Sequence, residues 1–197
     1  MAKCPIFPLT GFPRYVILKI GKGHKEVGMK ILYPEQYAET AFQVDYEVLR
    51  QKGVRLLMFD VDNTLETYNT TLPSRETRQW VRQLKKQGFQ IILVSNGAEK
   101  RVERFAASLG VSYVYRALKP LPIGIRRALE KAGCRPMNAA LIGDQIFTDV
   151  LGANWVGVHA ILTKPISTVD DEWITRIKRG LEKKVIARYL RKEGKRR

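Results

Sequence analysis

Short, almost wholly apolar runs alternate with amphipathic stretches from Arg55 to about residue 162, and this alternation constrains the fold most strongly. A near-continuous run such as Ile91-Ile92-Leu93-Val94 is typical of a strand buried on both faces. The expected strands are residues 55–60, 90–94, 112–115, 139–142 and 158–162. The expected helices are residues 74–87, 98–109, 123–132 and 147–154, the first with Ser74 as N-cap and Gly88 after its last turn. The alternation predicts an α/β fold, a parallel sheet with helices on both faces.

The first expected strand ends in two acids, Asp60 and Asp62, within Asp60-Val61-Asp62-Asn63-Thr64-Leu65. Their spacing of two residues would point both side chains to one side of an extended chain. A buried strand gains nothing from adjacent like charges at its end. We therefore expect a cationic group at the carboxyl edge of the sheet, where α/β proteins bind their ligands.

Two further strand ends offer groups that bind phosphate. Ser95-Asn96-Gly97 precedes an expected helix, so a hydroxyl and backbone N–H groups would form a phosphate cradle, although an ordinary capped turn has the same sequence. Lys119, fixed before Pro120, would bring a positive charge to the same edge, unless it is a solvated loop lysine.

The fourth strand end is acidic again, in Gly143-Asp144-Gln145-Ile146-Phe147-Thr148-Asp149. Carboxylates at this edge suit Mg²⁺, which prefers oxygen ligands. Asp149 lies five residues beyond Asp144, and it either supports this site or complements the N-terminus of the next helix.

An acid pair, a hydroxyl, a lysine and a further acid, in this order, resemble the haloacid dehalogenase (HAD) superfamily of aspartyl-nucleophile phosphatases. The resemblance covers residues 32–167. Leu32-x-Pro34, Lys119-Pro120 and the run from Gly143 to Asn154 resemble its subclass IIIA branch of YqeG and phosphatidylglycerophosphate phosphatases. One departure is Leu118, which stands where that branch commonly has a basic residue, with Arg116 nearby.

The resemblance implies a Rossmann-like HAD fold and a division of labour at the site. Asp60 would attack phosphorus and form an aspartyl-phosphate, and Asp62 would act as the general acid and base. Ser95, Asn96 and Lys119 would bind the phosphate, with Lys119 also counted among the catalytic residues. Mg²⁺ would be held by Asp60, Asp62 (through its carbonyl oxygen) and Asp144, with Asp149 as an outer support.

The spacing of the motifs leaves no room for a cap domain, which in this superfamily usually closes over small substrates. One helix and one strand account for most of the interval from Asp60 to Ser95, and the same holds from Ser95 to Lys119. An open site suits a phosphate on a large, lipidic or macromolecular carrier.

The chain is strongly basic, with a net charge of +16, which favours an anionic partner. Much of the excess lies in a C-terminal segment, where Thr168 and Asp171 resemble a helix start. An apolar stripe follows at Ile174, Ile177, Leu181, Val185 and Tyr189, and the basic residues flanking it are Lys178, Lys184, Arg188 and Arg191. This helix either docks on the domain's own core or lies on an anionic membrane.

We therefore expect an irregular arm over residues 1–30, a HAD phosphatase domain over 31–167, and a basic amphipathic helix and tail over 168–197. Two cysteines, Cys4 and Cys134, form no disulfide framework, and no apolar stretch reaches the ~20 residues of a membrane span, so a cytoplasmic setting is expected, including the membrane surface. The predicted activity is Mg²⁺-dependent hydrolysis of phosphatidylglycerophosphate. The alternatives are a broad small-molecule or nucleic-acid-end phosphatase, and a nucleic-acid- or ribosome-binding protein on the same fold, although no RNP-like motif supports nucleic acid.

Overall fold

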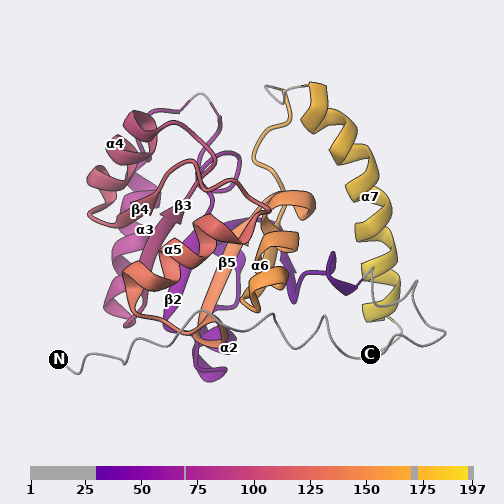
Figure 1. Cartoon of the computed structure of the whole chain (residues 1–197), viewed down its shortest axis with the longest axis horizontal. Helices are drawn as coiled ribbons and strands as arrows, with labels where there is room; N and C mark the ends of the chain where they lie inside the picture. Colours follow the sequence, from indigo (N-terminus) through magenta and orange to yellow (C-terminus); the bar gives the residue numbers. More distant parts are fainter. Residues whose placement is uncertain (1–29, 69, 170–172, 195–197) are drawn as a thin grey trace.

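The computed structural model describes residues 30–68, 70–169 and 173–194, so the expected N-terminal arm lies almost wholly outside the described residues. Six parallel strands form one sheet in the order β1-β6-β5-β2-β3-β4 (Figure 1). The strands are β1 (Gln36–Ala38), β2 (Leu56–Phe59), β3 (Gln90–Val94), β4 (Ser112–Val114), β5 (Ala139–Gly143) and β6 (His159–Thr163). The predicted parallel α/β sheet is confirmed.

Helices cover both faces of the sheet because neighbouring residues of each strand point to opposite sides. Leu57 and Phe59 of β2 pack in one core cluster with α3 (Arg75–Lys86) and α4 (Glu99–Leu109). Leu56 and Met58 pack in the other cluster with α5 (Pro122–Ala132) and α6 (Leu151–Val156). The other helices within the described residues are α2 (Tyr46–Gln51) and α7 (Trp173–Gly194), with short turns at Ala41–Gln43, Pro136–Asn138 and the π-helical Ile146–Val150.

The five expected strands and the first three expected helices agree with the observed bounds to within one residue at every end. Ser74 caps α3 by accepting a hydrogen bond from the Thr77 N–H, and Gly88 follows with a φ of 93°. Two features differ from the prediction. β1 adds an edge strand paired with β6, and the expected helix over 147–154 is a π-helical turn followed by α6. Only loops join β2 to α3 and β4 to α5, so no cap domain is inserted there.

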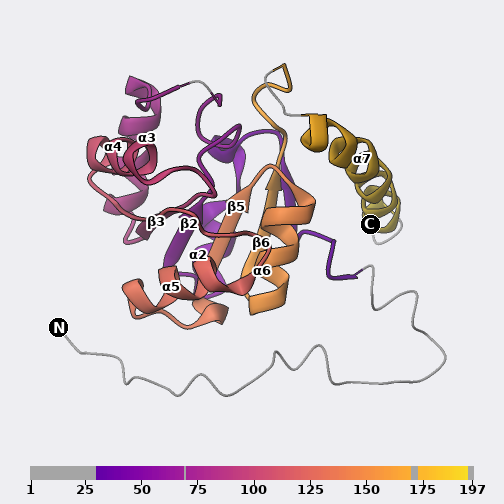
Figure 2. The same ribbon diagram turned by 45° about the horizontal axis from the view of Figure 1, so that its top comes forward.

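The C-terminal helix α7 stands beside the body formed by the sheet and the other helices (Figures 1 and 2). The expected apolar stripe along it is wrong as a single docking face. Val185 packs against the core and the Tyr189 ring lies 5.9 Å from that of Tyr33, whereas Ile177 and Leu181 are 59% and 50% exposed. Steps of four residues rotate around a helix by about 40° each, so the first and last members of such a stripe face different surroundings. The Ile174 side chain and Asp171 of the expected helix start lie outside the described parts.

None of the helices described is both long and apolar enough to cross a membrane.

Candidate active site

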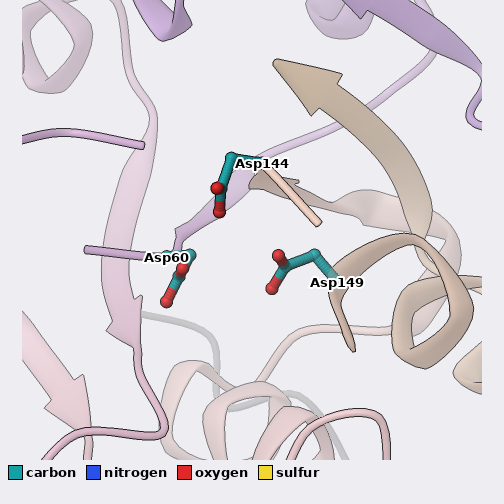
Figure 3. A group of neighbouring side chains, drawn as sticks. All are labelled: Asp60, Asp144 and Asp149. Atoms are coloured by element: carbon teal, nitrogen blue, oxygen red, sulfur yellow. The ribbon is translucent and has the colours of Figure 1, made fainter. Parts of the chain in front are cut away.

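Three buried carboxylates meet at the carboxyl edge of the sheet. Asp60 follows β2, Asp144 follows β5, and Asp149 lies in the π-helical turn after β5. One oxygen from each lies within 4.8 Å of the others, and the three side chains converge on a common space (Figure 3). The parallel topology explains this meeting, since adjacent parallel strands deliver their carboxyl ends to one edge.

Lys119 lies between two of these carboxylates. Its Nζ is 2.8 Å from Asp60 Oδ1 and 2.6 Å from Asp149 Oδ1, and its side chain is only 2% exposed. Asn96 holds the lysine's backbone from β3's end: Asn96 Oδ1 accepts from the Lys119 N–H at 2.8 Å, and Nδ2 donates to the Lys119 carbonyl at 3.2 Å. Asn96, predicted as a phosphate contact, thus has its amide group engaged in positioning Lys119.

Asp144 is held by groups from two distant parts of the chain. The Thr64 hydroxyl donates to it at 3.4 Å, and Arg179 of α7 pairs with its carboxylate and donates to its carbonyl oxygen at 2.7 Å. Glu182, one turn further along α7 and buried, accepts from the N–H groups of Ile146 at 2.7 Å and Phe147 at 3.3 Å. The C-terminal helix therefore contributes directly to the surroundings of the acidic cluster.

Asp62 lies outside this cluster, where its side chain forms an ion pair with Arg101 of α4. Arg101 also donates to the Tyr68 carbonyl oxygen at 2.8 Å, so it ties the loop after β2 to α4. The two acids of the predicted pair therefore have different surroundings. Asp60 belongs to the cluster, and Asp62 is paired with Arg101 outside it.

Ser95 follows β3 and is fully buried. Its Oγ accepts a hydrogen bond from the Gly97 N–H at 3.0 Å, which leaves the hydroxyl hydrogen free to donate to a ligand oxygen. A hydroxyl donor at this edge of the sheet is suited to binding an anion.

Gly143 makes room for Asp149. A Cβ at position 143 would lie 2.3 Å from Asp149 Cγ, closer than any side chain tolerates. Asp149 Oδ2 then accepts from the Gln145 N–H at 3.1 Å and from the Thr148 hydroxyl at 3.2 Å, which fixes the carboxylate. The Gly143-Asp144 pair therefore contributes to the cluster twice: Asp144 supplies a carboxylate, and Gly143 leaves space for the carboxylate of Asp149.

Burial dominates the protonation of the cluster. It raises the pKa of Asp60 to about 8, with Lys119 opposing and the carboxylates of Asp149 and Asp144 adding to the rise. It also raises the pKa of Asp144 to about 7, against the opposing charge of Arg179. For Lys119, burial alone would lower the ammonium pKa, but attraction to Asp149 and Asp60 outweighs it and the pKa is raised.

The donor set fits a hard divalent cation. Asp60, Asp144 and Asp149 supply oxygen atoms and the cluster contains no imidazole or thiolate, which matches the preference of Mg²⁺. The elevated pKa values point the same way, because a cation added to this site would favour the ionised carboxylates.

The residues predicted for the site are Asp60, Asp62, Ser95, Asn96, Lys119, Asp144 and Asp149. The structure brings four of them, Asp60, Lys119, Asp144 and Asp149, into direct contact or a shared cluster, with Ser95 at the adjoining strand end. Asp62 lies beside the cluster and Asn96 contacts the Lys119 backbone. Asp149, expected as an outer support, is a member of the cluster itself. Arg179 and Arg101 were missed. Neither lies in a recognisable motif, and Arg179 comes from a helix whose orientation no local pattern discloses.

A buried lysine among three aspartates, at the carboxyl edge of a parallel sheet, fits a hydrolase that acts on phosphoryl groups. The haloacid dehalogenase-like hydrolase family model matches residues 8–157, and the chain belongs to that family. It is a HAD phosphatase.

Two relatives indicate which branch of the HAD phosphatases this chain resembles. The probable phosphatase YqeG of Bacillus subtilis is 32% identical over 83% of this chain and 94% of its own length. The phosphatidylglycerophosphate phosphatase 1 of Arabidopsis thaliana, chloroplastic/mitochondrial, is 30% identical over 76% of this chain, which spans only 45% of that protein. A solved structure of an uncharacterised protein from Listeria monocytogenes shares the fold, with a TM-score of 0.50 at 19% identity over 61% of this chain and 84% of that one.

Proposed function

We propose that this phosphatase is a Mg²⁺-dependent phosphomonoesterase that works through an aspartyl-phosphate on Asp60, and that its substrate is phosphatidylglycerophosphate or a similar lipid phosphate. The observation that carries the proposal is the ion pair between Lys119 and Asp60 within a cluster of three buried carboxylates. This arrangement places a carboxylate oxygen and a fixed positive charge side by side, as nucleophile and anion binder require.

The metal would be held by Asp60, Asp144 and Asp149, with the carbonyl oxygen of Asp62 as the further ligand that the family resemblance suggests. When bound, Mg²⁺ would neutralise charge on the transferring phosphoryl group. Asp60 and Asp144, whose pKa values burial raises, would then be ionised at neutral pH.

The protein's own groups would divide the reaction as follows. An Asp60 oxygen attacks phosphorus as the bond to the leaving oxygen breaks, and Lys119 and the Ser95 hydroxyl bind the non-bridging oxygens of the phosphoryl group that is transferred. Asp62 gives a proton to the leaving oxygen and later removes one from the water that hydrolyses the aspartyl-phosphate. Arg101 holds Asp62 beside the cluster through one of its two carboxylate oxygens, Oδ1.

Two observations favour a lipid substrate. A relative that is 30% identical is named a phosphatidylglycerophosphate phosphatase, and no cap domain interrupts the loops after β2 and β4. A substrate with acyl chains stays in its bilayer, so the enzyme would act at a membrane surface.

A substrate panel tests the proposal. Purified protein with Mg²⁺ is assayed for phosphate release from phosphatidylglycerophosphate in mixed micelles, p-nitrophenyl phosphate, glycerol 3-phosphate and a 5′-phosphorylated oligonucleotide. Asp60→Asn serves as the inactive control, with back-deamidation excluded by mass. The proposal expects the highest kcat/KM on the lipid. Preference for a small ester or the oligonucleotide would replace the lipid substrate, and equal turnover by Asp60→Asn would refute the mechanism.

A further inference from the structure

The helix α7 has two faces with different surroundings. The face toward the body carries Arg179, Glu182, Val185, Ile186 and Tyr189, each buried or half-buried. Arg179 and Glu182 attach it to the active-site turn, and Val185 and Ile186 pack against the core. The opposite face is therefore held at a fixed orientation beside the site.

That opposite face is apolar and basic. Trp173, Ile177 and Leu181 follow one another at steps of four and are 70%, 59% and 50% exposed. The exposed basic residues of the helix are Arg176, Lys183, Lys184, Arg188, Arg191 and Lys192. Glu182 is the one acid of α7 whose side chain the structure describes, and it is buried against the body. Among the side chains that the structure describes in α7, the outward face thus combines apolar and positive groups and includes no acid.

The loops at the carboxyl edge of the sheet, beside the acidic cluster, expose further large apolar side chains. Leu118 and Leu121 flank the loop that carries Lys119 and are 55% and 46% exposed. Ile166 and Val169, in the loop from β6 toward α7, are 48% and 77% exposed. Both ribbon views place the loop after β6 and the start of α7 at the same end of the molecule (Figures 1 and 2).

We propose that the outward face of α7, together with these loops, is the surface on which the protein docks onto an anionic lipid bilayer, with the active-site edge toward the lipid. The reason for docking rests on the proposed lipid substrate. The choice of this surface rests on the apolar and basic side chains that it exposes. Apolar side chains flanked by lysine and arginine match the boundary between acyl chains and anionic headgroups. The acids at 170–172 precede this face in sequence and lie outside the described residues.

The choice of a bilayer over a protein partner follows from charge. Three of the six exposed basic residues are lysines, which protein interfaces typically exclude from their core, whereas all six complement a surface of continuous negative charge. Docking in this orientation would also bring the scissile phosphate, which lies at headgroup level, to the edge that carries Asp60 and Lys119.

Vesicle sedimentation tests the surface. The full-length protein is mixed with vesicles of phosphatidylcholine alone or of phosphatidylcholine with phosphatidylglycerol. One variant, Ile177→Ser/Leu181→Ser, removes apolar side chains, and a second, Lys184→Glu/Arg188→Glu, reverses charge. The control is Met137→Ser, because Met137 is 63% exposed in the turn before β5, at the opposite edge of the sheet.

Wild type and Met137→Ser should bind the anionic vesicles in preference to the neutral ones, and each double variant should bind them at least about tenfold more weakly. Hydrolysis of p-nitrophenyl phosphate is measured in parallel to separate a docking defect from a damaged site. Retention of vesicle binding by both double variants would overturn the inference, as would equal binding of wild type to neutral vesicles.

The inference and the proposed function can fail separately. A wild-type protein that hydrolyses phosphate esters but binds no vesicle would refute the docking surface and leave the phosphatase intact. Specific vesicle binding without any phosphatase activity would support the surface and refute the proposed reaction.

Discussion

At the residue scale, Lys119 holds the site together. A lysine with a 2% exposed side chain is stable only with compensating charge, and Asp60 and Asp149 supply it at 2.8 and 2.6 Å. The same contacts keep Asp60 oriented for attack and place a positive charge where a phosphoryl oxygen would bind. Structural and chemical roles therefore coincide in one side chain.

Replacing this lysine should impair both roles. We expect Lys119→Met to lower kcat by about 10²–10³-fold, since a charge that stabilises the transition state is lost. It should also reduce the free energy of unfolding by about 3–5 kcal/mol in the metal-free protein, because two buried carboxylates lose their partner. Steady-state kinetics and urea denaturation measure the two effects. Lys131→Met, on the exposed end of α5, is the control, and near-normal kcat in Lys119→Met would contradict the assignment.

The raised pKa values of Asp60 and Asp144 make stability depend on pH and metal. In the folded protein Asp60 and Asp144 have pKa values of about 8 and about 7, above their ordinary values. At pH values between the ordinary pKa of an aspartate and these raised values, the folded protein therefore binds more protons than the unfolded chain. Metal-free stability should thus fall as pH rises from about 4 to 8.

Mg²⁺ should offset that loss, so the rise in Tm on adding Mg²⁺ to EDTA-treated protein should be larger near pH 8 than near pH 5.5. Differential scanning fluorimetry at the two pH values measures it, with Asp144→Asn as the variant expected to reduce the difference. A Tm increment that is the same or smaller at the higher pH would show that these carboxylates are not the metal's ligands.

At the scale of the elements, α7 contacts the proposed metal site through Arg179. Arg179 pairs with the Asp144 carboxylate, the same group that we propose as a Mg²⁺ ligand. A guanidinium and a divalent cation repel each other across one carboxylate, so the position of α7 and the occupancy of the metal site should be linked.

Removing the guanidinium should therefore tighten metal binding. We expect Arg179→Gln to bind Mg²⁺ several-fold more tightly than wild type by isothermal titration calorimetry. Lys183→Gln is the matched control, since it removes the same charge from an exposed position of α7. Weaker binding in Arg179→Gln would show instead that Arg179 positions Asp144 for the metal.

The elements also show how far the sequence could predict this structure. Strand ends were predicted closely because each apolar run stops where a polar site residue begins, as at Phe59-Asp60 and Gly143-Asp144. β1 was missed because Gln36-Tyr37-Ala38 is short and only half-buried at the sheet's edge. The face of α7 was misassigned because periodicity identifies apolar positions but not the neighbours that cover them.

The site was predictable to the extent that its residues follow strands. Asp60, Lys119 and Asp144 could be placed at one edge from parallel topology alone. The pairing of Asp62 with Arg101, of Asp144 with Arg179 and of Asn96 with the Lys119 backbone depends on side-chain geometry across elements, which no sequence pattern encodes.

At the scale of the whole molecule, one edge of the sheet gathers the acidic cluster, the lysine loop and the anchored end of α7, without a cap domain between β2 and α3 or between β4 and α5. The reaction, the metal and the lipid surface would all meet at this edge. The central step at this edge would be the transfer of the phosphoryl group to Asp60.

Trapping that intermediate tests the claim most directly. The protein is mixed with Mg²⁺ and substrate, quenched in acid during turnover, reduced with borohydride to convert an acyl phosphate into homoserine, and digested for peptide mass spectrometry. We expect homoserine at position 60 in wild type, dependent on substrate, and none in Asp60→Asn. Normal turnover with position 60 unmodified, or with the modification at another residue, would contradict it.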